Sequence, residues 1–544
     1  MLTNNNKNQV VFLFLIAFAV VVYFVGLFVD VAGDAAKYAA IAKNIFHSGD
    51  FVNLTIHGDP YDQKPPFLFW LSTLGYYLFG ISNFGYKFFP VLYGFFGVFC
   101  VYKLGESLYS KPVGKIAALL LSFSEIYYLY SVDVHTDIVL LSNMAFALWQ
   151  LHAYLKNKKT LHFVLGFIGV GMAMLTKGPI GIFVPALAVI FYLVFNKRYK
   201  ELFHPKWILG ILITVVTAIP AFYGLYNQFG MKGLEFFFWT NNFGRIAGTY
   251  TGSTNTDYFF YLHTLLYIFA PWGFLLFVGV FFEFKSLAKK QAENADYFLL
   301  GGIWIFFLIL SVARGKSPNY ILIIMPLLTV LLAKWLHRFL EQPNSRIFKI
   351  VSGMQLSVVS LLWVCLLLFV GYLFPIHQLG YWALIGLSLI LTVYIYRRSK
   401  SAFTRLFAPS MLVITLLSFF LNSHILPYIF RFQSSIVATR KFNEVADSKA
   451  KLYNYDYEQF ELFFYGRDNV ELIEDSTELA TVCKKPDSWI FCYEDGLNDI
   501  KSLNVQTDTI YEFKHRGVYR TGIQFILPSS RVRSLGTTFL VKVN

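Results

Sequence analysis

Charged residues are scarce in this sequence. Asp, Glu, Lys and Arg together make up 14% of its 544 residues, whereas a soluble domain typically carries about 25%. This shortage excludes both an ordinary cytosolic enzyme and a disordered chain. The sequence also lacks the motifs GxxxxGK[ST], GxSxG, HExxH and CxxC. Their absence disfavours nucleotide-driven transport and zinc hydrolysis of those types.

Apolar residues are abundant instead, at 56% of the chain. A helix that crosses the hydrocarbon core of a bilayer needs about 20 mostly apolar residues. By this measure we expect a mostly α-helical, polytopic membrane protein with about 13 transmembrane helices. The expected spans lie near residues 9–29, 85–104, 113–131, 136–155, 161–176, 179–195, 207–227, 258–282, 297–313, 319–337, 350–374, 381–396 and 407–428.

The composition changes after residue 430. Residues 431–544 contain 15 Lys and Arg and 16 Asp and Glu, with no apolar run of span length. The segments 488–493 (SWIFCY) and 522–527 (GIQFIL) lie between turn residues and indicate short strands. We therefore expect a transmembrane domain over 1–430 and a small soluble α/β domain over 431–544. Cys483 and Cys492 lie in this second domain, and their spacing leaves open whether they pair.

The net charge of +14 is distributed unevenly across the expected topology. With a cytoplasmic N-terminus, the cytoplasmic connections hold 22 of the 46 Lys and Arg residues, and the outward loops and outer helix ends hold 9. Basic residues near short loops stay on the cytoplasmic side. We therefore expect the N-terminus inside and the C-terminal domain outside. The excess charge then faces anionic lipid, and no nucleic-acid partner is needed to explain it.

The first outward loop, residues 30–82, contains two expected interfacial helices. In the first, Asp34, Lys37, Tyr38, Ile41 and Ile45 share one helical face, which predicts an amphipathic helix at the membrane interface. The alternative is a surface helix on which Asp34 and Lys37 are simply solvated.

Lys64 directly precedes Pro65 and Pro66, and the apolar segment 67–80 that follows is too short to span upright. This order places Lys64 at the interface, near the expected site. A lysine that snorkels to the membrane surface is the alternative.

Asp133, His135 and Asp137 form a cluster between the third and fourth expected spans. Acids at the mouth of a membrane bundle are costly and indicate a functional site. The alternative is structural, because Thr136 or Asp133 could cap the next helix.

Cations also occur on the outward side, where the topology rule predicts few. They are Lys177, Arg245, Arg314 and Lys316. Each could anchor a helix end. Together with the acids, they favour a site for an anionic group, of which a lipid phosphate is the natural candidate.

Several of these segments, taken in order, resemble the C-type membrane glycosyltransferases. The branch is that of the bacterial aminoarabinose transferases of lipid A and the dolichyl-phosphate-mannose–protein mannosyltransferases, and the resemblance covers residues 1 to about 430. The family's first-loop pattern of approximately D-E-x-R-Y-A, S-G-D-W, G-x-P-Y and E-K-P-P-x-x-Y-W is found here as 34–39 (DAAKYA), 48–51 (SGDF), 58–61 (GDPY) and 63–70 (QKPPFLFW). Later family-like features are 176–179 (TKGP), Asn242 with Arg245, 271–272 (PW), and Arg314, Lys316, Tyr320 and Pro326.

The resemblance implies an inverting glycosyltransferase of the bacterial inner membrane. Its donor would be a sugar on a polyprenyl phosphate, its acceptor a glycolipid or a protein, and its site periplasmic. The implied catalytic acids are Asp34 and Asp137. The implied phosphate-binding residues are Lys64, Lys37, Arg245, Arg314 and Lys316, and further site candidates are Tyr38, Asp133, Lys177 and Tyr320. Membrane lipids are the other expected partners. We expect no nucleic acid, and we expect the protein to be a monomer.

Two departures from the family pattern bear on cofactors. Ala35 stands where the family often has Glu, and Gln63 stands where it often has an acid. Both remove oxygens that could bind a divalent cation, which disfavours a metal-dependent mechanism and leaves a divalent cation as the alternative; we expect no other cofactor. Lys37 in place of Arg also lacks the planar fork that grips a phosphate.

A transporter or flippase of lipid-linked sugars is the alternative function from another class. Transporters usually place polar residues near the bilayer midplane on broken helices. The polar residues here cluster on outward loops, which favours the enzyme. A structural scaffold with an exported binding domain would leave Asp34, Lys64 and Asp137 unexplained.

Overall fold

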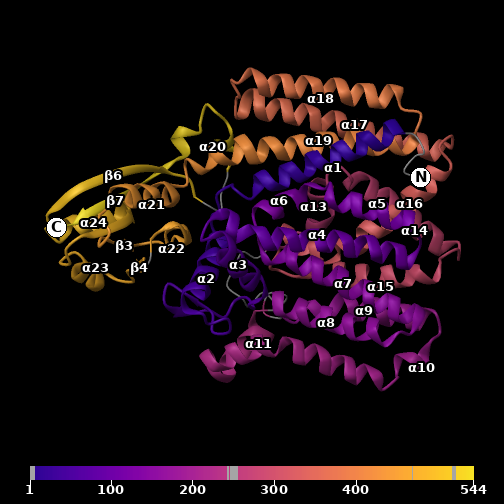
Figure 1. The fold of residues 1–544 in the computed structure, drawn as a ribbon, viewed down its shortest axis with the longest axis horizontal. Helices are drawn as coiled ribbons and strands as arrows, with labels where there is room; N and C mark the ends of the chain where they lie inside the picture. The colour runs from indigo at the N-terminus through magenta and orange to yellow at the C-terminus, as the bar shows by residue number, and fades with distance from the viewer. Residues whose placement is uncertain (1–5, 242–243, 245–254, 468–469, 518–521, 544) are drawn as a thin grey trace.

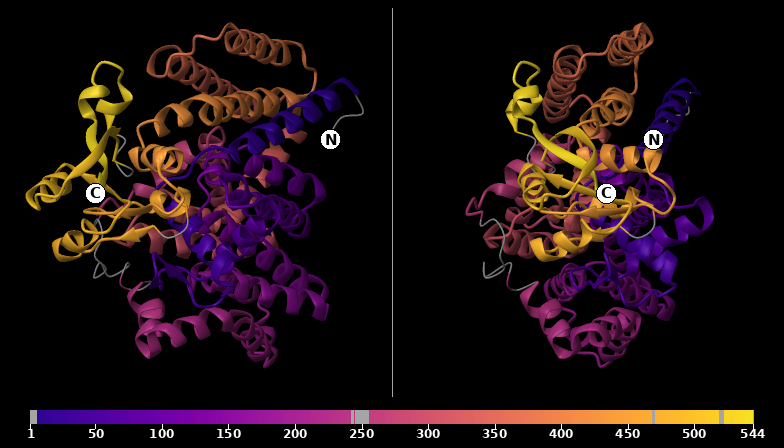
Figure 2. Two further views of the ribbon diagram at one scale, coloured as in Figure 1. Left: turned by 60° about the vertical axis from the view of Figure 1, so that its left-hand side comes forward. Right: turned by 90° about the vertical axis from the view of Figure 1, so that its left-hand side faces the viewer.

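The protein is a helical bundle joined at one end to a smaller domain that contains a β-sheet (Figure 1). The computed structural model describes residues 6–241, 244, 255–467, 470–517 and 522–543. Helix α1 begins at the end of the bundle opposite the C-terminal domain, and the views in Figure 2 show that domain covering the other end. The predicted fold class, a mostly helical membrane protein with a C-terminal α/β domain, is confirmed.

Ten helices in the described part of the chain are long and apolar enough to cross a membrane, and they match ten of the predicted spans. Three begin at a serine cap, where Ser82, Ser345 and Ser401 accept hydrogen bonds from backbone N–H groups three residues on. The helices of these spans are α1 (Asn6–Gly26), α4 (Asn83–Leu108), α7 (Thr136–Asn157), α8 (Thr160–Lys177), α11 (Lys206–Glu235), α15 (Asn294–Val312), α16 (Met325–Glu341), α17 (Arg346–Leu368), α18 (Leu379–Arg398) and α19 (Ala402–Phe420).

The other three predicted spans are shorter or interrupted. The segment near 179–195 is α9 (Ile180–Phe195), a shorter apolar helix. The segment 113–131 is divided into α5 (Lys111–Ser122) and α6 (Glu125–Val132), and 258–282 into α13 (Phe260–Ile268) and α14 (Gly273–Ala288). Neither divided segment is the single helix that we predicted.

The two interruptions are compatible with a membrane because they satisfy each other. Pro271 has no N–H to donate within a helix, and it follows Ala270, whose carbonyl accepts the Glu125 N–H at 2.8 Å. The Trp272 indole N–H donates to the Phe123 carbonyl at 3.0 Å. Irregular backbone at membrane depth is tolerated only where protein groups replace the lost hydrogen bonds, and here each interruption supplies partners for the other.

Small residues let neighbouring helices approach closely. Helix α4 packs on α7 through Gly97, where a Cβ atom would lie 2.3 Å from the Ser142 hydroxyl oxygen. Helix α8 packs on α11 in the same way through Gly171, next to Thr217. Without a hydrophobic driving force between helices in lipid, such close contact is what holds them together.

The long connection after α1 folds against the same end of the bundle as the C-terminal domain (Figure 1). It contains α2 (Asp34–Ser48), a short hairpin of β1 (Thr55–Ile56) and β2 (Asp59–Pro60), and α3 (Phe67–Phe79). Helix α2 packs on α3 and on a helix of the C-terminal domain, and Tyr38, Ile41 and Ile45 are buried in these contacts. Shorter elements elsewhere are α10 (Tyr199–Leu202), η1 (Phe236–Thr240), η2 (Pro318–Ile324), η3 (Phe369–Leu373), η4 (Leu421–Ile425) and α20 (Leu426–Phe430).

The C-terminal domain is built on a mixed five-stranded sheet with the strand order β4-β3-β5-β7-β6. The central strand β5 alternates between two apolar layers: Ile490 and Cys492 pack on one side, and Trp489 and Phe491 on the other. Its strands are β3 (Lys451–Asn454), β4 (Glu471–Leu472), β5 (Ser488–Tyr493), β6 (Thr507–His515) and β7 (Gly536–Val543). The helices around it are α21 (Ser434–Val445), α22 (Phe460–Tyr465), α23 (Ser476–Val482), α24 (Glu494–Ser502), α25 (Ile523–Ile526) and the short η5 (Val532–Ser534).

The strand predicted at 488–493 is confirmed as β5, whereas the one predicted at 522–527 is wrong. That segment is the helical turn α25, in which Phe525 is buried against Phe432. The Arg531 guanidinium donates to the carbonyls of Phe525 and Ile526 and fixes the turn. A short apolar run does not distinguish strand from helix by itself. Cys483 and Cys492 are both buried with free thiols.

Candidate functional site

The first helix of the outward loop begins at an acid–base pair. Asp34 is the first residue of α2 and follows Gly33, whose φ of 58° is a backbone conformation that suits glycine. The Lys37 ammonium lies 2.9 Å from the Asp34 carboxylate, and the Asp34 side chain is still 40% exposed. Burial acts to raise the pKa of Asp34, but Lys37, with His135 and Lys64, lowers it overall. Asp34 is therefore an ionised, accessible carboxylate at neutral pH.

His135 connects Asp34 with the acids at the start of α7. Its Nε2 atom lies 3.3 Å from the Asp133 carboxylate, and its ring meets the edge of the Tyr38 ring at 5.7 Å. Burial lowers the pKa of His135, but Asp133, Asp137 and Asp34 together raise it overall. The imidazole thus contacts Asp133 directly, and the negative charges of Asp137 in α7 and Asp34 in α2 also act on it.

Asp137 is buried and already has partners. Its carboxylate accepts hydrogen bonds from the Lys177 ammonium at 2.5 Å and from the Asn319 side-chain amide at 2.8 Å. Lys177, at the end of α8, also lies over the Tyr320 ring, 4.7 Å from its centroid. Burial and the nearby charges of Asp34 and Asp137 raise the pKa of the Tyr38 phenol. Three transmembrane segments, α7, α8 and η2 with α16, therefore meet at Asp137.

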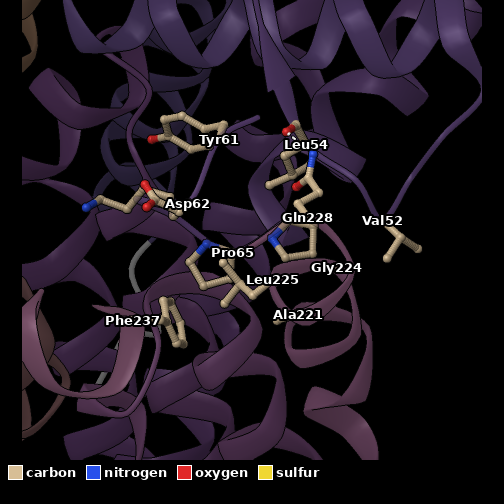
Figure 3. A pocket seen from close by; sticks show the side chains of 12 residues that line it. Val52, Leu54, Tyr61, Asp62, Pro65, Ala221, Gly224, Leu225, Gln228 and Phe237 are labelled. Carbon is tan, nitrogen blue, oxygen red and sulfur yellow. Dashed lines mark hydrogen bonds between the residues drawn. The ribbon is translucent and has the colours of Figure 1, made fainter. Parts of the chain in front are cut away.

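Lys64 lines a pocket between the first loop and α11, shown in Figure 3. The cavity volume is about 10 Å³, about the space that one water molecule needs. Figure 3 shows Tyr61 and Asp62 on one side of it and Phe237 below. The loop is fixed there by α11, because the Gln228 amide donates to the Leu54 carbonyl at 3.0 Å. Lys64 is close enough to Asp34 to lower the pKa of that carboxyl.

The other predicted cations lie apart from Asp34 or outside the described residues. The Lys316 ammonium donates to the backbone carbonyls of Asp257 at 2.7 Å and Asn255 at 3.2 Å. The Arg314 side chain is exposed, and its backbone carbonyl accepts the Asn255 N–H. Arg245 lies outside the residues that the structure describes.

The structure therefore brings most of the predicted residues together. Asp34, Lys37, Tyr38, Lys64 and Asp133 form one side of the cluster, and Asp137, Lys177 and Tyr320 form the other. The contacts also include His135, which the sequence placed in one cluster with Asp133 and Asp137, and two residues that the sequence did not indicate, Asn319 and Phe460. Asn319 lies in the segment of Arg314, Lys316 and Tyr320, which was already of interest. Phe460 comes from the C-terminal domain, and nothing in its local sequence indicates a site.

Among the described residues, no three His, Cys, Asp or Glu side chains are grouped so that they could hold a metal ion. Ala35 is fully buried, and the Gln63 main-chain carbonyl accepts a hydrogen bond from the Asn241 side chain at 3.0 Å. The positive charges that lower the pKa of Asp34 are those of Lys37, His135 and Lys64, and the Lys37 ammonium contacts the carboxylate directly.

Comparison with known proteins identifies relatives in sequence. Residues 63–223 match the family PMT_2, described as dolichyl-phosphate-mannose-protein mannosyltransferase. An undecaprenyl phosphate-alpha-4-amino-4-deoxy-L-arabinose arabinosyl transferase of Edwardsiella ictaluri is 28% identical over 60% of this chain and 58% of that protein. One of Pseudomonas savastanoi pv. phaseolicola is 26% identical over 67% of each chain. An uncharacterized protein of Aquifex aeolicus is 28% identical over 77% of this chain and 78% of its own length. The match thus spans about three fifths of the Edwardsiella transferase and two thirds of the Pseudomonas one.

Comparison of folds extends the likeness to the whole chain. The crystal structure of ArnT from Cupriavidus metallidurans bound to undecaprenyl phosphate superposes with a TM-score of 0.75 over 99% of this chain and 98% of that one, at 18% sequence identity. This likeness includes the C-terminal domain, which lies outside the PMT_2 segment. The resemblance that the motifs predicted is therefore confirmed: the chain is similar in sequence to the PMT_2 family over residues 63–223 and in fold to ArnT over nearly its whole length.

Proposed function

We propose that this protein transfers a sugar from a polyprenyl-phosphate donor to an acceptor of the cell envelope, on the periplasmic face of the inner membrane and with inversion. One observation carries the proposal: an accessible, ionised carboxylate, Asp34, lies 2.9 Å from the Lys37 ammonium at one end of a membrane bundle, and the charge of Lys64 also lowers its pKa. The names of the related arabinosyl transferases supply the donor class, a sugar on undecaprenyl phosphate.

On the donor side, the cations match the chemistry of the leaving group. When the bond between the anomeric carbon and the phosphate oxygen breaks, the polyprenyl phosphate leaves with that electron pair and gains negative charge. Lys64 and Lys37 are placed to stabilise this charge, and contacts that strengthen as it develops lower the barrier. Arg245, Arg314 and Lys316 are further phosphate-binding residues in the proposal.

On the acceptor side, Asp34 orients the nucleophile. Its lowered pKa keeps it ionised, so it accepts a hydrogen bond from an acceptor hydroxyl and takes the proton as the new carbon–oxygen bond forms. If the acceptor is a phosphate oxygen, no proton needs to move. Attack opposite the departing phosphate inverts the anomeric configuration.

Asp137 supports the site through its partners. It is 2% exposed and is bound by Lys177 and Asn319, so its carboxylate holds the Lys177 ammonium next to Tyr320. Tyr38, His135 and Asp133 connect this pair with Asp34. In the proposal Asp137 is the second essential acid, and no metal ion is required because lysine side chains supply the positive charge.

The test is transfer by the full chain in proteoliposomes. The donor is undecaprenyl-phosphate-linked 4-amino-4-deoxy-L-arabinose, the acceptor is lipid A, and mass spectrometry detects the modified lipid. We expect transfer by the natural sequence and none by Asp34→Asn. A second donor carries a hexose on the same lipid. If the folded natural protein transfers sugar from neither donor to any acceptor offered, the proposed function is wrong.

A protein mannosyltransferase is the second candidate, and the description of the matching family favours it. In that case a mannose on polyprenyl phosphate would be the donor, and a Ser or Thr hydroxyl the acceptor. The same proteoliposomes, offered dolichyl-phosphate mannose and a Ser/Thr-rich peptide, distinguish the two by whether mass is added to the lipid or to the peptide.

A further inference from the structure

Helix α22 of the C-terminal domain lies against α2 of the first loop, although more than 400 residues separate them in the chain (Figure 1). The contact is polar as well as apolar. The Lys43 ammonium donates to the carbonyls of Gly466 at 2.7 Å and Phe463 at 3.3 Å. The Tyr465 hydroxyl accepts the Val31 N–H at 2.7 Å. These bonds fix the domain on the loop independently of the residues discussed next.

Within this contact, Glu461 binds the backbone directly before Asp34. Its carboxylate accepts the Gly33 N–H at 2.8 Å, the Ser435 hydroxyl at 3.1 Å and the Gln433 amide at 3.4 Å. All three donors are neutral. Burying a carboxylate among neutral groups is costly, and Glu461 is only 1% exposed. A carboxylate retained there at such cost needs an explanation beyond packing.

The position of Gly33 supplies that explanation. Gly33 is the N-cap of α2 and has φ 58° and ψ −129°. In an unfolded chain a glycine adopts many other backbone conformations, so contacts in the folded protein must hold it in this one. The Gly33 carbonyl accepts the first helical bond, from the Lys37 N–H at 2.9 Å. Holding the Gly33 N–H fixes the peptide group on one side of Gly33, and the first helical bond fixes the peptide group on the other side, so the two bonds together restrain where α2 starts. A carboxylate at a helix N-terminus is also favoured by the helix dipole.

The residue next to Glu461 holds the partner of Asp34. The Phe460 ring lies under the Lys37 ammonium, 4.8 Å from ring centroid to nitrogen, and Lys37 is the cation paired with Asp34. Two adjacent residues of the C-terminal domain thus hold the peptide before Asp34 and the cation beside it.

We propose that Glu461 is a positioning residue for Asp34 and acts through the Gly33 peptide. The C-terminal domain is then part of the catalytic unit and not a separate binding module. This inference rests on the proposed function. A misplacement of a reacting group by about 1 Å can cost on the order of 100-fold in rate, so loss of Glu461 lowers kcat while the affinity for the donor is retained.

The experiment compares Glu461→Ala and Glu461→Gln with Glu471→Ala in the full chain. Glu471 is in the same domain but is 47% exposed and paired with Lys451. We expect Glu461→Ala to lower kcat by 10-fold or more with the donor KM within threefold of the natural protein. Glu461→Gln keeps an oxygen for the Gly33 N–H and should restore kcat to within about threefold. Glu471→Ala should match the natural protein.

A second measurement does not depend on activity. Hydrogen–deuterium exchange of the amides at residues 33–37 should accelerate in Glu461→Ala and stay unchanged in Glu471→Ala. Unchanged exchange there, or a folded Glu461→Ala variant with kcat within twofold of the natural protein, overturns the inference. If the natural protein transfers no sugar, the proposed function fails, and the exchange measurement still decides whether Glu461 fixes the Gly33 peptide.

Discussion

The ammonium of Lys177 and the carboxylate of Asp137 lie 2.5 Å apart, although the residues are 40 positions apart in the sequence. The pair is almost fully buried, with the Lys177 side chain 12% and the Asp137 side chain 2% exposed. Removing one member of a buried pair leaves the other charge uncompensated, which costs about 3–5 kcal/mol. Both the stability and the arrangement of the candidate site depend on this pair.

Lys177→Met should therefore destabilise the protein by about 3 kcal/mol, and it should reduce transfer at least tenfold. Thermal unfolding in detergent and the proteoliposome assay measure the two effects. The double variant Asp137→Asn with Lys177→Met is the control, because no charge then remains buried. It should be less destabilised than the sum of the two single variants, and simple additivity would contradict the coupling.

Asp34→Asn should abolish detectable transfer and leave the unfolding temperature nearly unchanged. The carboxylate is 40% exposed and partly solvated, so its charge contributes little to folding, whereas loss of a general base typically costs about 100-fold to 10,000-fold in rate. Asp508→Asn, the same change at an exposed ion pair with Lys542, should leave the rate unaltered. Wild-type turnover by a folded Asp34→Asn protein would remove Asp34 from the mechanism.

Lys64→Ala should raise the donor KM about tenfold, if its ammonium contributes about 1.4 kcal/mol to binding the donor phosphate. Initial rates at varied donor concentration measure it. Lys232→Ala removes an exposed cation from α11, away from the pocket, and should leave the donor KM unchanged. Equal effects of the two substitutions would point to a general influence of surface charge and against phosphate binding by Lys64.

His57 links the first loop with the C-terminal domain in a pH-dependent way. Its ring nitrogens lie 3.0 Å from Asp59 and 2.8 Å from Glu458. Burial lowers the pKa of His57, but Glu458 and then Asp59 raise it overall above its usual 6.5. A group whose folded pKa is raised contributes stability below its unfolded pKa and loses that contribution as the pH rises through the folded pKa.

Stability should consequently decline as the pH rises from about 6 to 8, because His57 loses its proton in the folded state. Thermal unfolding across this range measures the decline, and His57→Gln should flatten that part of the profile. His47, exposed at the end of α2, provides the matched control His47→Gln, which should keep the slope. A slope that survives in His57→Gln would assign it to other groups.

A second buried charge cluster lies at the opposite end of the bundle. The Lys334 ammonium contacts Glu283 at 2.9 Å and Asp296 at 2.5 Å, and all three side chains are at most 2% exposed. Lys334→Met leaves two uncompensated carboxylates and should destabilise the protein by about 3–5 kcal/mol. Lys285→Met, at an exposed position of α14, should have little effect on the unfolding temperature. Equal unfolding temperatures for the two variants would contradict a stabilising role for the cluster.

Much of the fold could be predicted because membrane burial is a local property of sequence. An apolar run of about 20 residues can satisfy its backbone in lipid only as a helix, so ten spans were evident from composition alone. The helix interruptions at Phe123 and Pro271 were not evident from composition, because they are stabilised by hydrogen bonds to each other. The turn at 522–527 was predicted as a strand for a similar reason: its conformation depends on Arg531, which binds its carbonyls.

The sequence by itself determined that the chain crosses the membrane many times, and its ordered motifs placed Asp34, Lys64 and Asp137 among the site candidates. Only the tertiary structure decided which groups meet. Lys177 pairs with Asp137, while Lys316 binds backbone carbonyls instead. Glu461 reaches Gly33 across 428 positions of sequence. Such pairings follow from how helices pack and domains dock. A local sequence pattern cannot predict them, because the residues that meet in space are distant in the chain.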